Sequence, residues 1–391
     1  MRTFRSLRHR DYRLYFVGQL VSLIGSWTQV TALMWLAHEQ TQQAKWPAFL
    51  VAAQIGPTLL LGAFGGALAD RMPMRRLIAR TQVGFLGCAA SLLLLYYTGW
   101  LTVPAMLAVM FAHGVIQAID LPARLAFVPS LVDRDDLINA VALNSLLFNA
   151  ARAVGPAVAG ILLAWGGPGA CFVVNAVSYL AILAAIALIR ARPAVPDTPQ
   201  RVRGGGFGVL AKQPGMLVLV ILAGAAAVGG WPLMALLPSF ADSVLGAGQA
   251  GYSFLLSAVG VGALVAALTA ATFGTEARRK PFLLGGLLLT AAALAGLTAA
   301  RTIWPAAGCC AVFGYGMILF FATGQSAVQL GTVDANRGKV MGVWAMVLSA
   351  GVPVGNLVFG PAADAFGLTA VLCVQTAILA AAAGGLLRYR F

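Results

Sequence analysis

The sequence HGVIQAIDLPARLAFVPSLVDRDDLINAVALNSLLFNAARAVGPAVAG (residues 113–160) places charged and amide side chains inside two long apolar segments. A short charged turn, residues 133–136, joins the two segments. The polar residues follow one another at steps of three or four, which stacks them on one face of an α-helix. They are His113, Gln117, Asp120 and Arg124 in the first segment, and Ser145, Asn149 and Arg152 in the second. An ionisable side chain at membrane depth costs about 2.5–3.5 kcal/mol on insertion scales, so this polar face predicts a functional site.

The composition of the chain excludes a water-soluble fold. Of 391 residues, 60% are hydrophobic and only 10% are charged, whereas soluble domains carry about 25% charged residues. A helix that crosses a bilayer needs about 20 apolar residues. Twelve stretches meet this need and predict an all-α membrane protein: residues 12–37, 47–69, 76–98, 101–127, 137–165, 169–189, 214–240, 249–273, 281–300, 303–331, 338–363 and 368–387.

The distribution of basic residues predicts the orientation of these spans. The net charge is +14, and of the Lys and Arg in the loops only Lys45 and Arg301 fall on one side of the predicted membrane. Cytoplasmic loops are enriched in Lys and Arg, so both termini are expected in the cytoplasm and the chain in the inner (cytoplasmic) membrane. Anionic lipid headgroups, rather than nucleic acid, are therefore the expected neighbours of the basic charge. The five cysteines lie within the spans without metal-ligand spacing and are expected to pack as small apolar residues.

The chain divides near its middle into two related halves. The longest connector runs from Arg190 to Gln213 and is rich in Pro, Arg and Gly, which suits a flexible linker. Motifs recur across it at offsets of 200 to 204 residues, as where Gly160 is matched by Gly360. This repetition predicts two six-helix bundles related by an axis along the membrane normal. We expect an N-terminal bundle at 1–190, a linker at 191–213 and a C-terminal bundle at 214–391.

The two halves differ in charge at the polar face. The positions that match Asp120 and Arg124 are Phe321 and Gln325 in the second half, so chemistry that needs protonation is expected in the first half. Asp120 is either a proton carrier or the partner of Arg124 in a purely structural ion pair, with direct substrate contact as a third role. Desolvation and a nearby arginine shift the pKa of a carboxyl in opposite directions, and the sequence leaves both readings open.

Two further ionisable residues accompany this pair. Arg152 is expected to share Asp120 or Asp70 as its counterion. His113 is the only histidine expected within a span, and it is either part of a proton relay or an uncharged packing residue.

A polar face also follows the first span, where the residues again fall at helical spacing. It lines a cavity or makes hydrogen bonds between helices. Together with polar residues of the later spans it defines the expected substrate cavity: Gln19, Ser22, Ser26, Gln29, Gln117, Ser145, Asn149, Trp231, Gln325, Gln329 and Asn356. At the end of the second span, Gly62, Gly66 and Ala69 form a small face that predicts close helix packing.

The duplicated bundles, the loop GGALADRMPMRR and the tract ARAVGPAVAG resemble the major facilitator superfamily over the whole chain. The segments FRSLRHRDYRLYFVGQLVSLIGSW, DLPARLAFVPSLV and SLLFNAARAVGPAVAG are similar to its exporter branch, which contains the enterobactin exporter and macrolide-efflux proteins. The resemblance implies a gating motif at Gly66, Asp70, Arg71, Arg75 and Arg76, with Pro73 and Met74 departing from the usual pattern. It also implies a proton-coupling role for Arg124 and an incomplete antiporter motif at Gly155, Pro156 and Gly160.

These observations predict a secondary active transporter. It would export small amphipathic organic molecules, drug-like or siderophore-like, by alternating access and in exchange for protons. A lysophospholipid or lipid flippase of the same fold is the alternative, and a membrane sensor or scaffold is a third. The sequence has no Walker motif and no catalytic constellation, so we expect neither enzyme activity nor a cofactor or metal, with the proton gradient as the energy source. The expected partners are the substrate and the lipid bilayer, and the expected state is a monomer.

Overall fold

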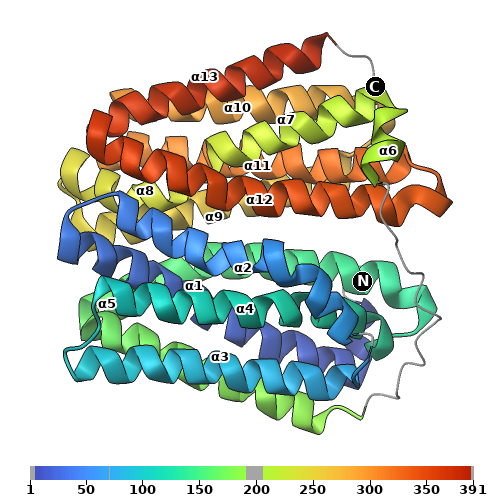
Figure 1. The fold of residues 1–391 in the computed structure, drawn as a ribbon, viewed down its shortest axis with the longest axis horizontal. Coiled ribbons are helices and arrows are strands. Elements are labelled where there is room, and N and C mark those ends of the chain that lie inside the picture. The colour runs from blue at the N-terminus through green and yellow to red at the C-terminus, as the bar shows by residue number, and fades with distance from the viewer. Residues whose placement is uncertain (1–4, 70, 191–205, 389–391) are drawn as a thin grey trace. The chain divides into compact units, whose positions relative to one another are not determined.

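A computed structural model describes residues 5–69, 71–190 and 206–388. These residues are almost entirely helical, and no strand occurs among them. The chain forms two compact units (Figure 1). The first comprises residues 1–40 and 53–199, and the second comprises residues 41–52 and 200–391. The second unit therefore includes the start of a helix whose remainder belongs to the first.

The first unit is built from long apolar helices with short helical turns at their ends. They are η1 (Arg5–Arg8), α1 (Arg10–Thr41), α2 (Lys45–Ala69), α3 (Met74–Tyr97), α4 (Val103–Phe127), η2 (Val128–Leu131), η3 (Arg134–Asp136) and α5 (Leu137–Leu188). Helix α3 packs against both α4 and α5. Apolar and aromatic side chains fill this part of the core, among them Tyr15, Phe85, Phe127 and Tyr179.

The second unit repeats this construction. It contains α6 (Gly206–Ala211), α7 (Pro214–Gly230), α8 (Leu233–Ser239), η4 (Phe240–Val244), α9 (Gly248–Phe273), η5 (Glu276–Arg278), α10 (Arg279–Ala299), α11 (Ile303–Leu330), α12 (Asp334–Phe366) and α13 (Leu368–Leu387). Helix α11 packs between α9 and α10, and α13 packs against α7 and α10. Residues 191–205 of the expected linker lie outside the described residues.

Ten stretches of the described chain are long and apolar enough to cross a membrane. One of them covers two predicted spans, because α5 continues through Gly167, where the backbone has φ 64° and ψ −168°. This left-handed φ favours glycine and turns the chain between the two halves of α5. Helix α2 is not among the ten, although its bounds agree with the second predicted span. The prediction of an all-α fold with long membrane-spanning helices is confirmed.

Glycines allow α2 and α4 to approach closely. A Cβ atom at Gly65 would collide with the carbonyl oxygen of Ala118, and one at Gly114 would collide with that of Gln54. The close packing expected at Gly62 and Gly66 is not seen among the described residues of the first unit. A Cβ at either position would meet no described atom within 4 Å. One step along the helix, Gly65 instead faces α4, and small residues at such contacts let backbones pack closely.

The start of α2 is anchored within the second unit. Asp364, near the end of α12, accepts hydrogen bonds from the backbone N–H groups of Ala44 (2.6 Å) and Lys45 (3.2 Å). A carboxylate at this position satisfies N–H groups that have no partner in the helix and interacts favourably with the helix dipole. Asp364 is thus a helix cap.

Candidate functional site

Asp120 lies completely buried in the first unit, where three of the described side chains contact its carboxylate. The guanidinium of Arg124, one helical turn further along α4, forms an ion pair with Oδ2. Two donors come from α3: the hydroxyl of Thr81 lies 2.6 Å from Oδ1, and Nε2 of Gln82 lies 3.1 Å from the same oxygen. A buried carboxylate needs such partners because desolvation without them is costly. The structure thus confirms that Asp120 and Arg124 meet and adds two donors.

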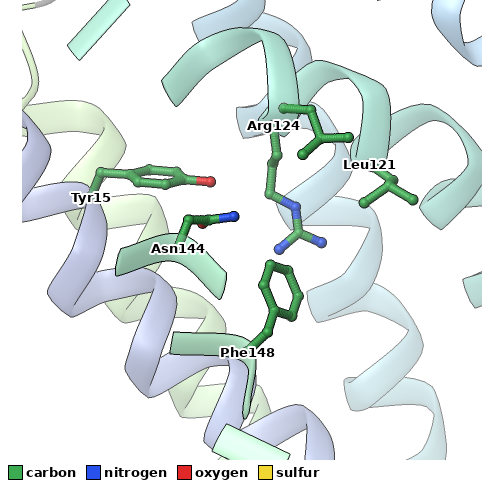
Figure 2. Close-up of a pocket in the computed structure, with 6 residues that line it drawn as sticks. Tyr15, Leu121, Arg124, Asn144 and Phe148 are labelled. Carbon is green, nitrogen blue, oxygen red and sulfur yellow. The ribbon is translucent and has the colours of Figure 1, made fainter. Parts of the chain in front are cut away.

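Arg124 also lines a hollow at the surface of the first unit (Figure 2). Its other lining residues come from α1, α4 and α5: Tyr15, Leu121, Leu125, Asn144 and Phe148. The guanidinium lies beside the side chains of Leu121 and Phe148. Nε of Arg124 is buried, and no described atom accepts a hydrogen bond from it. Arg124 therefore lies between the buried carboxylate and this small hollow.

Other titratable groups surround this ion pair. The phenols of Tyr15 and Tyr179 and the imidazole of His113 all interact electrostatically with Arg124. The ring of His113 packs against Phe85 with 4.5 Å between centroids. His113 is not the only buried histidine, since His38 near the end of α1 is 1% exposed. The role of His113 in a proton relay stays a prediction.

Arg152 lies further along α5 and contacts the aromatic ring of Trp27. Its guanidinium carbon is 5.5 Å from the centroid of the Trp27 ring on α1. Gly155 permits this approach, because a Cβ there would collide with the Cβ of Trp27. Pro156 and Gly160 follow on the same helix. A cation–π contact of this kind stabilises a charge that has left water.

Hydrogen bonds within the first unit use much of the polar face of α1. The hydroxyl of Ser26 shares a hydrogen bond with that of Tyr179 (3.1 Å), and Gln29 Oε1 accepts one from Asn175 Nδ2 (2.8 Å). Gln19 and Ser22 are buried as well, and no described residue bonds to Gln19 Oε1. Ser26 and Gln29 thus make hydrogen bonds between helices, which is one of the two roles predicted for this face.

The remaining candidates for the cavity are divided between the two units. In the first unit, Oε1 of Gln117 is buried without a hydrogen-bond partner among the described residues. Asn149 is half-buried, and the side chain of Ser145 lies outside what the structure describes. In the second unit, Trp231 stacks on Phe321 with 5.9 Å between centroids, and Asn356 bonds to the carbonyl of Val352. Gln325 is exposed and Gln329 is half-buried.

In the loop motif after α2, one arginine has a defined structural task. Arg75 donates hydrogen bonds to the carbonyls of Ile186 (2.9 Å) and Ala187 (2.7 Å) at the end of α5. It caps carbonyls that lack partners in the helix. Arg71 and Arg76 are exposed, and Asp70 lies outside the described residues.

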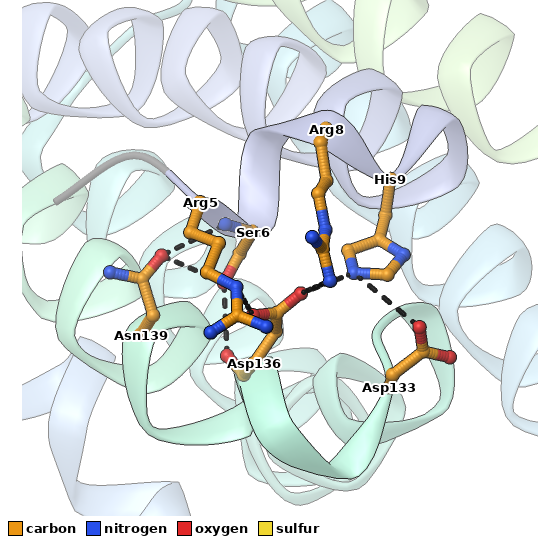
Figure 3. Close-up of polar contacts among 7 residues, drawn as sticks. All are labelled: Arg5, Ser6, Arg8, His9, Asp133, Asp136 and Asn139. Carbon is orange, nitrogen blue, oxygen red and sulfur yellow. Dashed lines mark hydrogen bonds and ion pairs between the residues drawn. The ribbon is translucent and has the colours of Figure 1, made fainter. Parts of the chain in front are cut away.

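A second buried carboxylate, which the sequence pattern did not single out, lies at the start of α5 (Figure 3). Asp136 pairs with Arg5 (2.8 Å), Arg8 (2.8 Å) and His9 (2.7 Å) from the beginning of the chain. The hydroxyl of Ser6 donates a hydrogen bond to the backbone carbonyl of Asp136 at 2.9 Å. The hydrogen bond from His9 is the main cause that lowers the pKa of Asp136 below its usual value, and the positive charges of Arg5 and Arg8 lower it further. The cluster fastens the amino-terminal segment to α5.

Comparisons with known proteins agree with this architecture. A family model described as "transmembrane secretion effector" matches residues 1–391. The enterobactin exporter EntS of Escherichia coli is 27% identical over 368 residues, which cover 90% of this chain and 85% of the exporter, and that of Escherichia fergusonii matches equally. The nucleoside transporter NupG superposes with a TM-score of 0.76 at 14% identity and covers 97% of this chain and 100% of its own. A bacterial homologue of the lysosomal transporter Spinster gives 0.76 at 14% identity, covering 97% and 96%.

Proposed function

Because the chain belongs to the transmembrane secretion effector family of major facilitator transporters, we propose that it exports small amphipathic organic molecules in exchange for protons. The substrate class would be drug-like or siderophore-like, and the resemblance to the enterobactin exporter supports the latter. The protein would work as a monomer in the inner membrane, with both termini in the cytoplasm.

The observation that carries this proposal is the buried Asp120 with its ion pair to Arg124. A carboxylate with no exposed surface inside a membrane-spanning helix is costly to keep, and such residues mark ion pathways in membrane proteins. Protonation removes the charge of Asp120 and leaves Arg124 without its counterion. One proton therefore changes the electrostatics of the whole cluster.

The proton would bias two conformations of the transporter. A ligand shifts an equilibrium only by its differential affinity for the two states. The state that keeps the ion pair intact would accept substrate from the cytoplasm. Protonation of Asp120 from the outer side would favour substrate release and the return of the empty transporter. Each cycle would then export one substrate while protons enter.

Efflux driven by a pH gradient tests the proposal. Purified wild type and Asp120→Asn would be reconstituted in proteoliposomes and assayed for efflux of antibiotics, dyes and siderophores, enterobactin included, with and without the gradient. The matched control is Asp135→Asn, which removes an exposed carboxylate in the same unit. We expect the control to retain gradient-driven efflux and Asp120→Asn to lose it.

The same assay distinguishes the alternatives. Wild-type efflux from Asp120→Asn would remove this residue from the coupling mechanism. Lipid movement that ignores the gradient would favour a flippase of the same fold. No flux of any ligand would favour a sensor or scaffold.

A further inference from the structure

We infer that Thr81 is a positioning residue for proton coupling, whose hydroxyl reverses its hydrogen bond when Asp120 takes up a proton. The hydroxyl donates to the ionised carboxylate and accepts from the neutral carboxyl. The inference rests on the proposed function, because it describes how the coupling carboxyl group keeps a hydrogen bond to Thr81 in both of its protonation states.

The hydroxyl of Thr81 lies within hydrogen-bond distance of two acceptors. Its oxygen is 2.6 Å from Oδ1 of Asp120 on α4 and 2.8 Å from the backbone carbonyl oxygen of Ile78 on its own helix. A hydroxyl has one proton to donate and two lone pairs that can accept, so Thr81 donates to one of these oxygens at a time. While Asp120 is ionised, its carboxylate is the stronger acceptor. The carbonyl of Ile78 then remains as a second acceptor to which the same proton can turn.

Protonation at Oδ1 reverses the first hydrogen bond and leaves the heavy atoms in place. The added proton binds Oδ1 of Asp120 and points at the oxygen of Thr81, which accepts it over the same 2.6 Å. The hydroxyl proton of Thr81 rotates about the Cβ–Oγ bond and is donated to Ile78 instead. No proton leaves Thr81, so the cluster gains one proton and one positive charge. Thr81 and Asp120 are both buried, and this arrangement leaves no O–H without an acceptor, which would be costly there.

The other neighbours of the carboxyl group do not accept its proton. Arg124 pairs with Oδ2, and a guanidinium has five N–H donors but no acceptor. Nε2 of Gln82 donates to Oδ1 from 3.1 Å. Tyr15 on α1, Tyr179 on α5 and His113 on α4 interact electrostatically with the ion pair, but the hydrogen bonds of the carboxylate within the described chain come from other side chains. The threonine hydroxyl is therefore the bonded neighbour that can accept.

Efflux from variants that keep or lose the hydroxyl tests the inference. Thr81→Val keeps the shape of the side chain and removes the hydroxyl, whereas Thr81→Ser keeps the hydroxyl. Thr269→Val is the matched control, because the hydroxyl of Thr269 on α9 donates to the backbone carbonyl of Val265. We expect Thr81→Val to slow gradient-driven efflux about tenfold, since the neutral carboxyl then buries an O–H without an acceptor. Thr81→Ser and the control should keep the wild-type rate.

Infrared difference spectra between acidic and alkaline buffer detect the hydrogen bond itself. The full-length protein would be reconstituted in proteoliposomes, and the C=O stretch of protonated Asp120 is the band that Asp120→Asn removes. A carboxyl O–H that lacks an acceptor gives this band at higher wavenumber. We expect the band to move upward in Thr81→Val and to keep its position in Thr81→Ser, in Thr269→Val and in Gln82→Met, which removes a donor. Thr81→Ala, which adds no bulk, gives the same readings if the valine variant fails to insert.

The inference is overturned if the variant without the hydroxyl keeps either the wild-type band position or the wild-type efflux rate. It is also overturned if Gln82→Met moves the band as far as Thr81→Val, or if Thr81→Ser loses as much efflux as Thr81→Val. In each of these cases, loss of gradient-driven efflux in Asp120→Asn leaves the proposed function standing. Full efflux from Asp120→Asn, together with no infrared band that this substitution removes, would overturn the coupling proposal itself.

Discussion

Replacing Asp120 by asparagine should destabilise the protein mainly through Arg124. Asparagine has the same shape, and its carbonyl oxygen can still accept from Thr81 and Gln82. Hydrogen bonds between membrane helices are worth about 0.6 kcal/mol each, so even the loss of the bond to Thr81 or to Gln82 would have a small effect. Removing one partner of a buried ion pair costs about 3–5 kcal/mol, because the other charge stays buried. The side chain of Arg124 is 14% exposed, which places the expected loss at the lower end of this range.

A double substitution tests that reasoning. In Asp120→Asn combined with Arg124→Gln, no charge remains, and replacing a buried ion pair by neutral groups is often close to neutral. Unfolding in mixed micelles at increasing SDS would measure the free energy of unfolding of wild type, both single variants and the double variant. We expect the double variant to recover most of the stability lost by Asp120→Asn, while all three variants lack proton-coupled efflux.

Two results would refute this account. Equal unfolding free energies for wild type and Asp120→Asn would mean that Asp120 carries no charge in the folded protein. Gradient-driven efflux from the double variant would mean that the pair is purely structural, the alternative that the sequence leaves open. The exposed Asp135→Asn should change neither stability nor efflux.

Three further substitutions test contacts described above. Gly65→Ala should lower the melting temperature, because its Cβ would strike the backbone of α4, whereas Gly66→Ala should leave it unchanged or raise it slightly. Asp136→Asn should lower the melting temperature at neutral pH. The pKa of Asp136 is lower in the folded protein than in the unfolded chain. Its stabilising effect is therefore present above the unfolded pKa of about 3.9 and is lost as pH falls through the folded pKa. The melting temperatures of wild type and variant should become equal at that low pH. Asp364→Ala should speed hydrogen exchange at the start of α2, since both N–H groups lose their acceptor, and unchanged exchange would show that the cap is unimportant.

Local sequence patterns predicted the helices and the central pair for a physical reason. Apolar stretches long enough to cross a bilayer must be helical or form a closed barrel, because lipid offers their backbone no hydrogen bonds. Asp120 and Arg124 are four residues apart on one helix, so helical geometry alone brings them together. The same geometry could not reveal Thr81 and Gln82, which reach Asp120 from α3.

Contacts between distant parts of the chain were missed for the same reason. Asp136 looked like one of several acids in a charged turn, yet it alone is buried and paired with the amino-terminal segment. An unusual density of basic residues at positions 5–9, close to a turn on the same predicted membrane side, is the signal that could have found it. No such signal exists for Asp364, because its carboxylate accepts hydrogen bonds from backbone N–H groups about 320 residues away in the sequence.

The contacts of Asp120 restrict how a proton and a substrate can be coupled. Of the three side chains that bond to the carboxylate, Thr81 and Gln82 do not line the hollow, and Arg124 does. A change in the charge of Asp120 is therefore transmitted to the hollow most directly by Arg124. Lysine at this position would keep the positive charge but lose the planar set of donors. Arg124→Lys should consequently retain much of the stability of the pair while weakening gradient-driven efflux. Normal efflux from Arg124→Lys would show that a positive charge, without the planar guanidinium, is sufficient for coupling.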